Sequence, residues 1–203
     1  MMVRKIIIYI SLLLLYSCSS TSIREDKNAP INDYLETQNL DNQKIMIIKE
    51  KINNNVTIAI FEGKTYYYEE SNKYVRVEGV QEPLYNKELW EKMKFQYENK
   101  STSDYWIKDS KWTRNDFRYK NIYFFKKEKL PKPWEYDKSI SKFREEYTIF
   151  TFSEPIYYDK KYAVFTKIRT STYSRTFGGR GIVIMEKVND KWVTIKEIGD
   201  GIY

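Results

Sequence analysis

The sequence predicts an α+β domain in which antiparallel β-meanders form a curved sheet, or two small sheets, packed by two helices. Three observations predict this class. Short runs rich in Ile, Val, Thr and Tyr, cut by Asn and Gly, follow residue 43. Two stripes of apolar residues at helical spacing come next, and four further strand-like runs end the chain. A helix that lies across a sheet buries the apolar faces of both elements.

The N-terminal segment predicts a secretory signal peptide rather than a permanent membrane span. Arg4 and Lys5 form a basic head, and residues 6–15 are almost wholly apolar. About ten apolar residues are too few to cross a bilayer of roughly 30 Å as a helix. The segment closes at Leu15-Tyr16-Ser17-Cys18, and Cys18 is the only cysteine of the chain. We therefore expect cleavage at this point and no disulfide within the chain.

Leu15, Ser17 and Cys18 resemble the cleavage site of bacterial lipoprotein signals, in which the cysteine is acylated and becomes the new N-terminus. The resemblance implies that Cys18 carries diacylglycerol and a further acyl chain such as palmitate. Stable anchoring takes two or more chains, because a single chain binds a membrane only marginally. Ser19, in place of Asp after the cysteine, implies sorting to the outer membrane. The alternative is an ordinary signal peptide that is cleaved at another residue, in which case the cysteine is not acylated.

The predicted organisation is a signal peptide at 1–17, a lipidated cysteine with a flexible tether at 18–42, and one α+β domain at 43–203. The residues that follow the cysteine are polar, which is typical of a tether. A division of the domain into sub-modules at 43–100 and 101–203 is the alternative.

Four short strands are predicted in the first part of the domain, at 44–52, 56–61, 64–70 and 74–79. Asn-rich and Gly-containing segments separate them, a pattern that indicates an antiparallel meander. Residues 57–61 and 64–68 form the clearest hairpin.

Two amphipathic helices are expected to cover the sheet. The first is capped by Asn86 and runs to about Glu98, and the second is capped by Asp137 and runs to Tyr147. Their apolar stripes face the core: Leu89, Trp90, Met93 and Tyr97 in the first, Ile140, Phe143 and Tyr147 in the second. Residues 31–40 are expected to form a short helix or coil.

Further strands are predicted on both sides of the second helix. A short hairpin at 105–108 and 112–114 and a strand at 122–126 precede it, and strands at 148–152, 162–173, 181–188 and 192–198 follow it. Residues 181–185 are apolar without alternation, which predicts a central strand covered on both sides. The helix 137–147 is expected to be one of its covers.

Several short motifs of the C-terminal region carry a second resemblance. They are Trp134, Phe143, Tyr147, Phe152-Ser153-Glu154-Pro155-Ile156, Asp159, Ala163-Val164, Gly179-Arg180-Gly181, Glu186-Lys187 and Lys191-Trp192. Together they look like the C-terminal region of small, largely uncharacterised lipoproteins of Gram-negative bacteria. The resemblance implies an autonomous module and brings no activity with it. Members of that family often carry cysteines beside the glycine loop, and this chain has none there.

Basic residues are concentrated in two parts of the chain. The whole chain has 35 Lys and Arg against 28 Asp and Glu, and residues 160–185 contain no acidic residue at all. Basic and aromatic residues alternate between Trp112 and Trp134, as they do on surfaces that bind single-stranded nucleic acid or another anionic polymer. A solvated basic face over an aromatic core is the alternative. The anion-binding candidates, expected to cluster on one face, are Arg114, Arg118, Arg169, Arg175 and Arg180.

The absence of histidine excludes Ser-His-Asp and Cys-His machinery and His-containing metal sites. We therefore predict no catalytic residue, metal or cofactor. The expected function is that of a lipid-anchored binding or structural module of the cell envelope, facing the periplasm or the cell surface. Its expected partners are the membrane and an envelope protein or anionic polymer, and no nucleic acid. An imidazole-free hydrolase or isomerase, with two carboxylates or a Lys and a carboxylate in a curved-sheet pocket, is the alternative.

Overall fold

The computed structural model describes residues 26–40, 44–63, 65–68, 73–76, 79–80, 84–129, 146–172 and 179–200 of the chain. The predicted signal peptide, Cys18 and Arg175 lie outside the described residues. So does the predicted helix 137–147 except for its end, where Tyr147 begins a strand instead.

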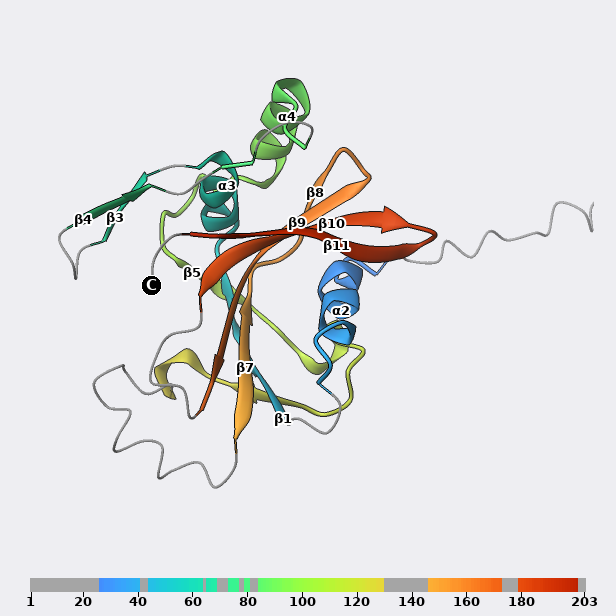
Figure 1. Cartoon of the computed structure of the whole chain (residues 1–203). Helices are drawn as coiled ribbons and strands as arrows, with labels where there is room; N and C mark the ends of the chain where they lie inside the picture. Colours follow the sequence, from blue (N-terminus) through green and yellow to red (C-terminus); the bar gives the residue numbers. More distant parts are fainter. Residues whose placement is uncertain are drawn as a thin grey trace, which may run out of the picture.

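The fold is α+β, as predicted, and its centre is one open, mixed sheet of seven strands (Figure 1). The strand bounds are β1 Lys44–Ile48, β2 Glu50–Ile52, β3 Thr65–Tyr68, β4 Lys73–Arg76, β5 Trp106–Lys111, β6 Ile122–Phe125, β7 Tyr147–Phe152, β8 Ile156–Tyr158, β9 Tyr162–Ser171, β10 Arg180–Val188 and β11 Lys191–Gly199. The large sheet has the order β11-β10-β9-β7-β1-β6, with β8 beside β9, and the pairs β2–β5 and β3–β4 form two small sheets.

The sheet combines a meander with a parallel block. Strands β7 to β11 pair antiparallel, as the prediction of a meander requires. Strand β1, in contrast, lies parallel to both of its neighbours, β6 and β7. The parallel block aligns the carboxyl ends of three strands at one edge of the sheet, and this edge matters for the candidate site.

The packed domain starts earlier than predicted, because helix α2 (Ala29–Glu36) belongs to the core and not to a tether. Pro30 lies in its first turn, where the missing N–H costs nothing. Ile31, Tyr34 and Leu35 are almost wholly buried against the sheet. The predicted tether at 18–42 is therefore wrong for residues 29–40.

The predicted strand 56–61 and its hairpin are wrong, since these residues form helix α3 (Asn54–Glu62). The side chain of Asn53 accepts a hydrogen bond from the backbone N–H of Asn55, and Gly63 closes the helix in the left-handed conformation, φ 68°. The polar segments that resemble turns in the sequence are thus the two helix caps. Burial of Ile58, Ile60 and Phe61 outweighs the β-propensity of the segment. The hairpin in this region is β3–β4.

Helix α4 (Lys87–Tyr97) confirms the first predicted helix and its cap. The side chain of Asn86 accepts a hydrogen bond of 3.1 Å from the N–H of Leu89. Trp90 and Met93 are its buried residues, and the Trp90 ring stacks on that of Phe61 at 4.6 Å. Helix α4 therefore packs on α3 as well as on the sheet.

The hairpin predicted around residues 109–111 is also wrong. Residues 106–111 form one continuous strand, β5, which pairs antiparallel with β2 and has an irregularity between Glu50 and Lys51. The polar residues of β5 are exposed on an edge, so polarity alone does not mark a turn here. Three-residue 3-10 helices follow at Arg114–Asp116 and Lys127–Lys129.

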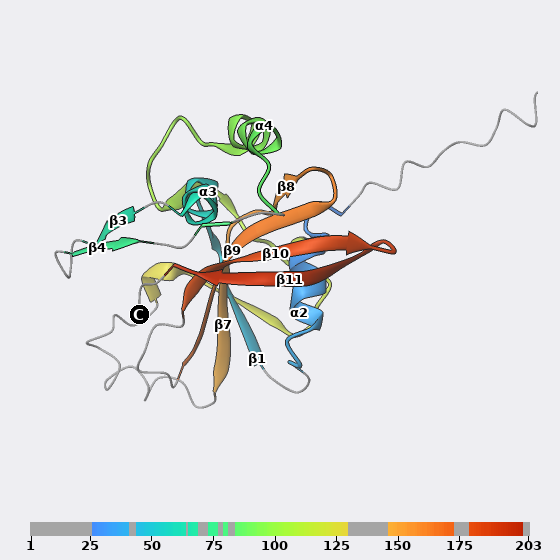
Figure 2. The same cartoon turned by 45° about the horizontal axis from the view of Figure 1, so that its top comes forward.

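Helices α2 and α3 cover opposite faces of the sheet (Figure 2). In β10, Val183 and Met185 belong to the core on the α2 side, whereas Ile182 and Ile184 belong to the core on the α3 side. The prediction that this apolar run is covered on both sides is thus confirmed. None of the described helices has the length and apolar character needed to cross a membrane.

Candidate functional site

The four arginine candidates among the described residues, Arg114, Arg118, Arg169 and Arg180, are engaged by the protein itself. Arg118 forms an ion pair with Asp33, and its guanidinium lies 3.3 Å from Glu36 and 4.0 Å from Asp26. Arg114 donates a hydrogen bond of 3.1 Å to a backbone carbonyl three residues further on. Arg118 therefore fixes α2 to the domain and is surrounded by carboxylates, which disfavour a bound anion.

Arg169 and Arg180 lie on opposite faces of the sheet. Arg169 is four residues from Phe165 on β9, so its side chain points to the same face of the sheet, the α2 side. It donates a hydrogen bond of 3.0 Å to Gln38. Arg180 has the orientation of Ile182, on the α3 side. Arg169 and Arg180 therefore do not share one surface, and anion binding by the candidate arginines stays a prediction.

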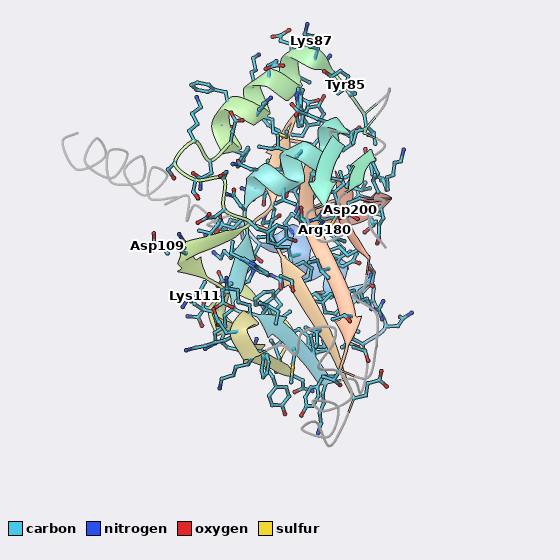
Figure 3. All side chains as sticks on the ribbon, turned by 90° about the vertical axis from the view of Figure 1, so that its left-hand side faces the viewer. Tyr85, Lys87, Asp109, Lys111, Arg180 and Asp200 are labelled. Atoms are coloured by element: carbon cyan, nitrogen blue, oxygen red, sulfur yellow. The ribbon has the colours of Figure 1, made fainter. Side chains whose placement is uncertain are left out.

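Arg180 belongs to a buried polar cluster at the start of β10. It pairs with the buried carboxylate of Asp200, beside which it lies in Figure 3, and its guanidinium is 5.5 Å from the ring centre of Tyr105. Burial raises the pKa of the Tyr105 hydroxyl, and the positive charge of Arg180 opposes this rise only in part. The cluster ties the end of β11 to the loop before β5, so its best-supported role is structural.

The neighbouring glycine, Gly181, has a packing role. A Cβ atom on Gly181 would collide with the backbone carbonyl oxygen of Ile198 on β11. Gly181 therefore permits the close approach of β10 and β11, and it lies within a strand and not in a loop.

The best candidate for a functional site is a group of converging charged side chains at the carboxyl edge of the parallel block. Ile52, at the end of β2, bridges Ser153, which follows β7 in the parallel direction. This register brings Lys51 and Glu154 together, and the Lys51 ammonium lies 2.6 Å from a Glu154 carboxylate oxygen. The same ammonium lies 4.5 Å from the centre of the Trp112 ring. A carboxylate and an aromatic face thus hold a buried cation.

A second lysine converges on the same carboxylate. The Lys27 ammonium lies 3.7 Å from the Glu154 oxygen that Lys51 contacts, and Lys27 is 69% exposed. Glu154 is itself 35% exposed, whereas Lys51 is 5% exposed. Two ammonium groups against one carboxylate leave one positive charge in excess. A ligand meets Lys27 and Glu154 first, and Lys51 forms the inner wall.

This arrangement supports two kinds of chemistry. The exposed Lys27 ammonium can donate hydrogen bonds to a carboxylate or phosphate oxygen of a ligand, and the buried charge of Lys51 adds to the attraction. A lysine paired with a carboxylate is also a combination that can transfer protons without histidine. Lys51 and Trp112 were not predicted as site residues, because both contacts depend on pairing between distant strands. The antiparallel pairing of β2 with β5 brings Trp112 to Lys51, and the parallel bridge from Ile52 to Ser153 brings Glu154 to it. No local signal marks Lys51, which stands in the charged run Lys49-Glu50-Lys51.

No protein-family model, curated protein or solved structure matches the chain. The two lipoprotein resemblances therefore stay predictions, and any functional proposal depends on the chain's own residues and geometry.

Proposed function

We propose that this protein is a lipid-anchored protein of the cell envelope, held at the outer membrane through Cys18, whose domain acts as a binding or structural module. The observation that carries the proposal is the position of the packed domain. Asp26, the first described residue, follows Cys18 by eight residues and already hydrogen-bonds to the start of α2. A domain that begins so soon after the cysteine is suited to remain at the membrane surface.

The Lys27–Glu154–Lys51 site supports binding, and it also defines where an enzyme would have to work. An envelope protein or polymer with carboxylate or phosphate groups fits the excess of one positive charge. An imidazole-free hydrolase or isomerase is the second candidate, since Lys51 and Glu154 supply a convergent lysine and carboxylate. Binding is the preferred proposal because Lys51 is held by Glu154 and Trp112 and is nearly inaccessible.

Membrane fractionation of cells that express the full chain tests the anchoring. The wild-type protein should sediment with outer membranes, resist extraction by high salt and be released by detergent. Cys18→Ser should shift the protein out of this fraction, whereas Ser20→Ala, which keeps the thiol, should not. A Cys18→Ser protein that stays in the outer-membrane fraction would contradict the proposal.

Assays with ester, phosphoester and glycoside substrates separate the two candidates. The purified protein should hydrolyse none of them above the buffer rate. If it hydrolyses one and Glu154→Gln abolishes the activity while circular dichroism is unchanged, the enzyme replaces the binding module.

A further inference from the structure

We propose that the domain faces the bilayer with one particular surface. This surface, the anchored face, consists of Lys27, the β8–β9 turn at 159–161, the β10–β11 turn at 189–190 and the side chains of Val188 and Val193. The proposal rests on the acylation of Cys18 and goes beyond it, because anchoring alone does not choose a face.

The short connection between the cysteine and the domain excludes the opposite orientation. Cys18 and Asp26 are eight residues apart, and eight fully extended residues span at most about 29 Å. A domain of roughly 180 residues has a radius of gyration of about 16 Å, which corresponds to a diameter of about 40 Å. If the domain turned its far side to the bilayer, the connection would have to pass around it, and it is too short to do so.

The point at which the chain joins the domain is fixed by hydrogen bonds. The Asn28 side chain donates to Asp116 at 3.0 Å, and its backbone N–H bonds to Asp26 at 2.9 Å. The Tyr157 hydroxyl on β8 donates to the backbone carbonyl of Lys27 at 2.9 Å. Asn28 is almost wholly buried. The direction from which the chain reaches the membrane is therefore set by the fold.

Ring contacts and hydrogen bonds join this point to the strands that carry the two turns. The Tyr157 ring lies 5.7 Å from the ring of Trp192 on β11, and the backbone N–H of Trp192 donates to Asp33 of α2 at 2.7 Å. The β8–β9 turn contacts the end of β10, since the N–H of Lys187 donates to the carbonyl of Lys161 at 2.9 Å. Lys27, the β8–β9 turn and the end of the β10–β11 hairpin thus lie at one end of the domain, on the side where the β10–β11 turn projects in Figure 1. Val188 and Val193 lie on this hairpin and point to its α3 side, opposite Trp192.

The shape of the anchored face is rigid. Asp159, Lys160, Asn189 and Asp190 all have positive φ, between 48° and 61°. Asn and Asp tolerate this conformation, and the two-residue turn at 189–190 has the φ values of the hairpin type that follows the twist of the strands. The tips that meet the bilayer therefore have a fixed position.

The side chains of this surface suit the boundary between headgroups and acyl chains. Val188 and Val193 are 44% and 47% exposed, and they are among the most exposed large apolar side chains of the described residues. Lysine stems can lie along apolar surface while the ammonium stays among the headgroups. The lysines of this surface are Lys27, Lys160, Lys161, Lys187 and Lys191, and the carboxylates around them are Glu154, Asp159, Glu186 and Asp190.

Five lysines against four carboxylates leave a small net charge. Attraction of so small a net charge to anionic lipid is weak and is screened by salt. We therefore infer that the length of the connection and the exposed valines orient the domain, and that the orientation persists in vesicles of neutral lipid.

Quenching of single labels in the acylated full-length protein tests the orientation. Because the only native cysteine carries lipid in this proposal, Val188→Cys or Val193→Cys supplies a unique thiol for a fluorophore. The protein is reconstituted into phosphatidylcholine vesicles with and without spin-labelled headgroups. Tyr123→Cys is the matched control, since Tyr123 is similarly exposed, at 52%, on β6 at the opposite end of the sheet.

Labels at 188 and 193 should be quenched at least twofold more strongly than the label at 123. Equal quenching at all three positions in protein that floats with the vesicles would overturn the orientation and leave the anchoring intact. Protein that fails to float, with unmodified Cys18, would overturn the anchoring itself. Twenty Gly and Ser residues inserted after Ser20 should remove the difference between 188 and 123, and a difference that persists would contradict the role of connection length.

Discussion

Asp33 is the residue whose replacement tests most sharply how α2 is held to the sheet. One of its carboxylate oxygens accepts the buried N–H of Trp192 at 2.7 Å, and the other pairs with Arg118. In Asp33→Ala the buried N–H loses its partner, which costs about 1–3 kcal/mol. Loss of the half-exposed ion pair adds at most about 1 kcal/mol. We expect a total loss of about 1–4 kcal/mol in the free energy of unfolding.

Urea unfolding followed by tryptophan fluorescence measures this loss, with Asp33→Asn and Glu36→Ala as controls. Asp33→Asn keeps an acceptor for Trp192 and should cost less than about 1 kcal/mol. Glu36→Ala removes only an exposed partner of Arg118 and should stay within about 0.5 kcal/mol of the wild type. If Asp33→Asn costs as much as Asp33→Ala, the charge and not the buried hydrogen bond holds α2, and the reasoning is refuted.

Three further predictions concern the cap of α3, the glycine between β10 and β11, and two buried tyrosines. Asn53→Ala removes the cap of α3 and should lower the free energy of unfolding by about 0.5–2 kcal/mol, measured by urea titration. Gly181→Ala should cost about 1–3 kcal/mol or more because its Cβ meets the neighbouring strand, whereas Gly179→Ala, which has open space, should be nearly neutral in the same titration. Burial raises the pKa of Tyr34 and Tyr105 above the ordinary value of about 10, so the unfolded state loses these protons first and stability should fall as pH rises above about 10. A double Phe variant should flatten this decline, and an unchanged slope would count against the burial of both hydroxyls.

The sequence predicted elements whose local signals agree with their final environment. Helix α4 has both a cap at Asn86 and an apolar stripe, and the apolar run of β10 is long enough to require cover on both sides. Helix α3 was mistaken for a strand because its β-branched residues and its caps are also typical of strands and turns. In that segment tertiary burial decides, and it does not show in the local pattern.

The candidate site could not be predicted, because it depends on pairing between distant strands. Lys51 and Glu154 are 103 residues apart, and only the parallel register of β1, β2 and β7 brings them together. Each of the two residues, taken alone in the sequence, resembles an ordinary surface charge. The separation of Arg169 from Arg180 has a related reason, since charge density along the chain does not reveal that alternate strand positions point to opposite faces.

Intact-mass spectrometry of the protein extracted from membranes tests the central claim most directly. We expect a chain that begins at Cys18 and carries the added mass of a diacylglycerol group and a further acyl chain. A chain with a bare thiol at Cys18, or one that starts at another residue, would contradict the anchoring and with it the orientation of the domain.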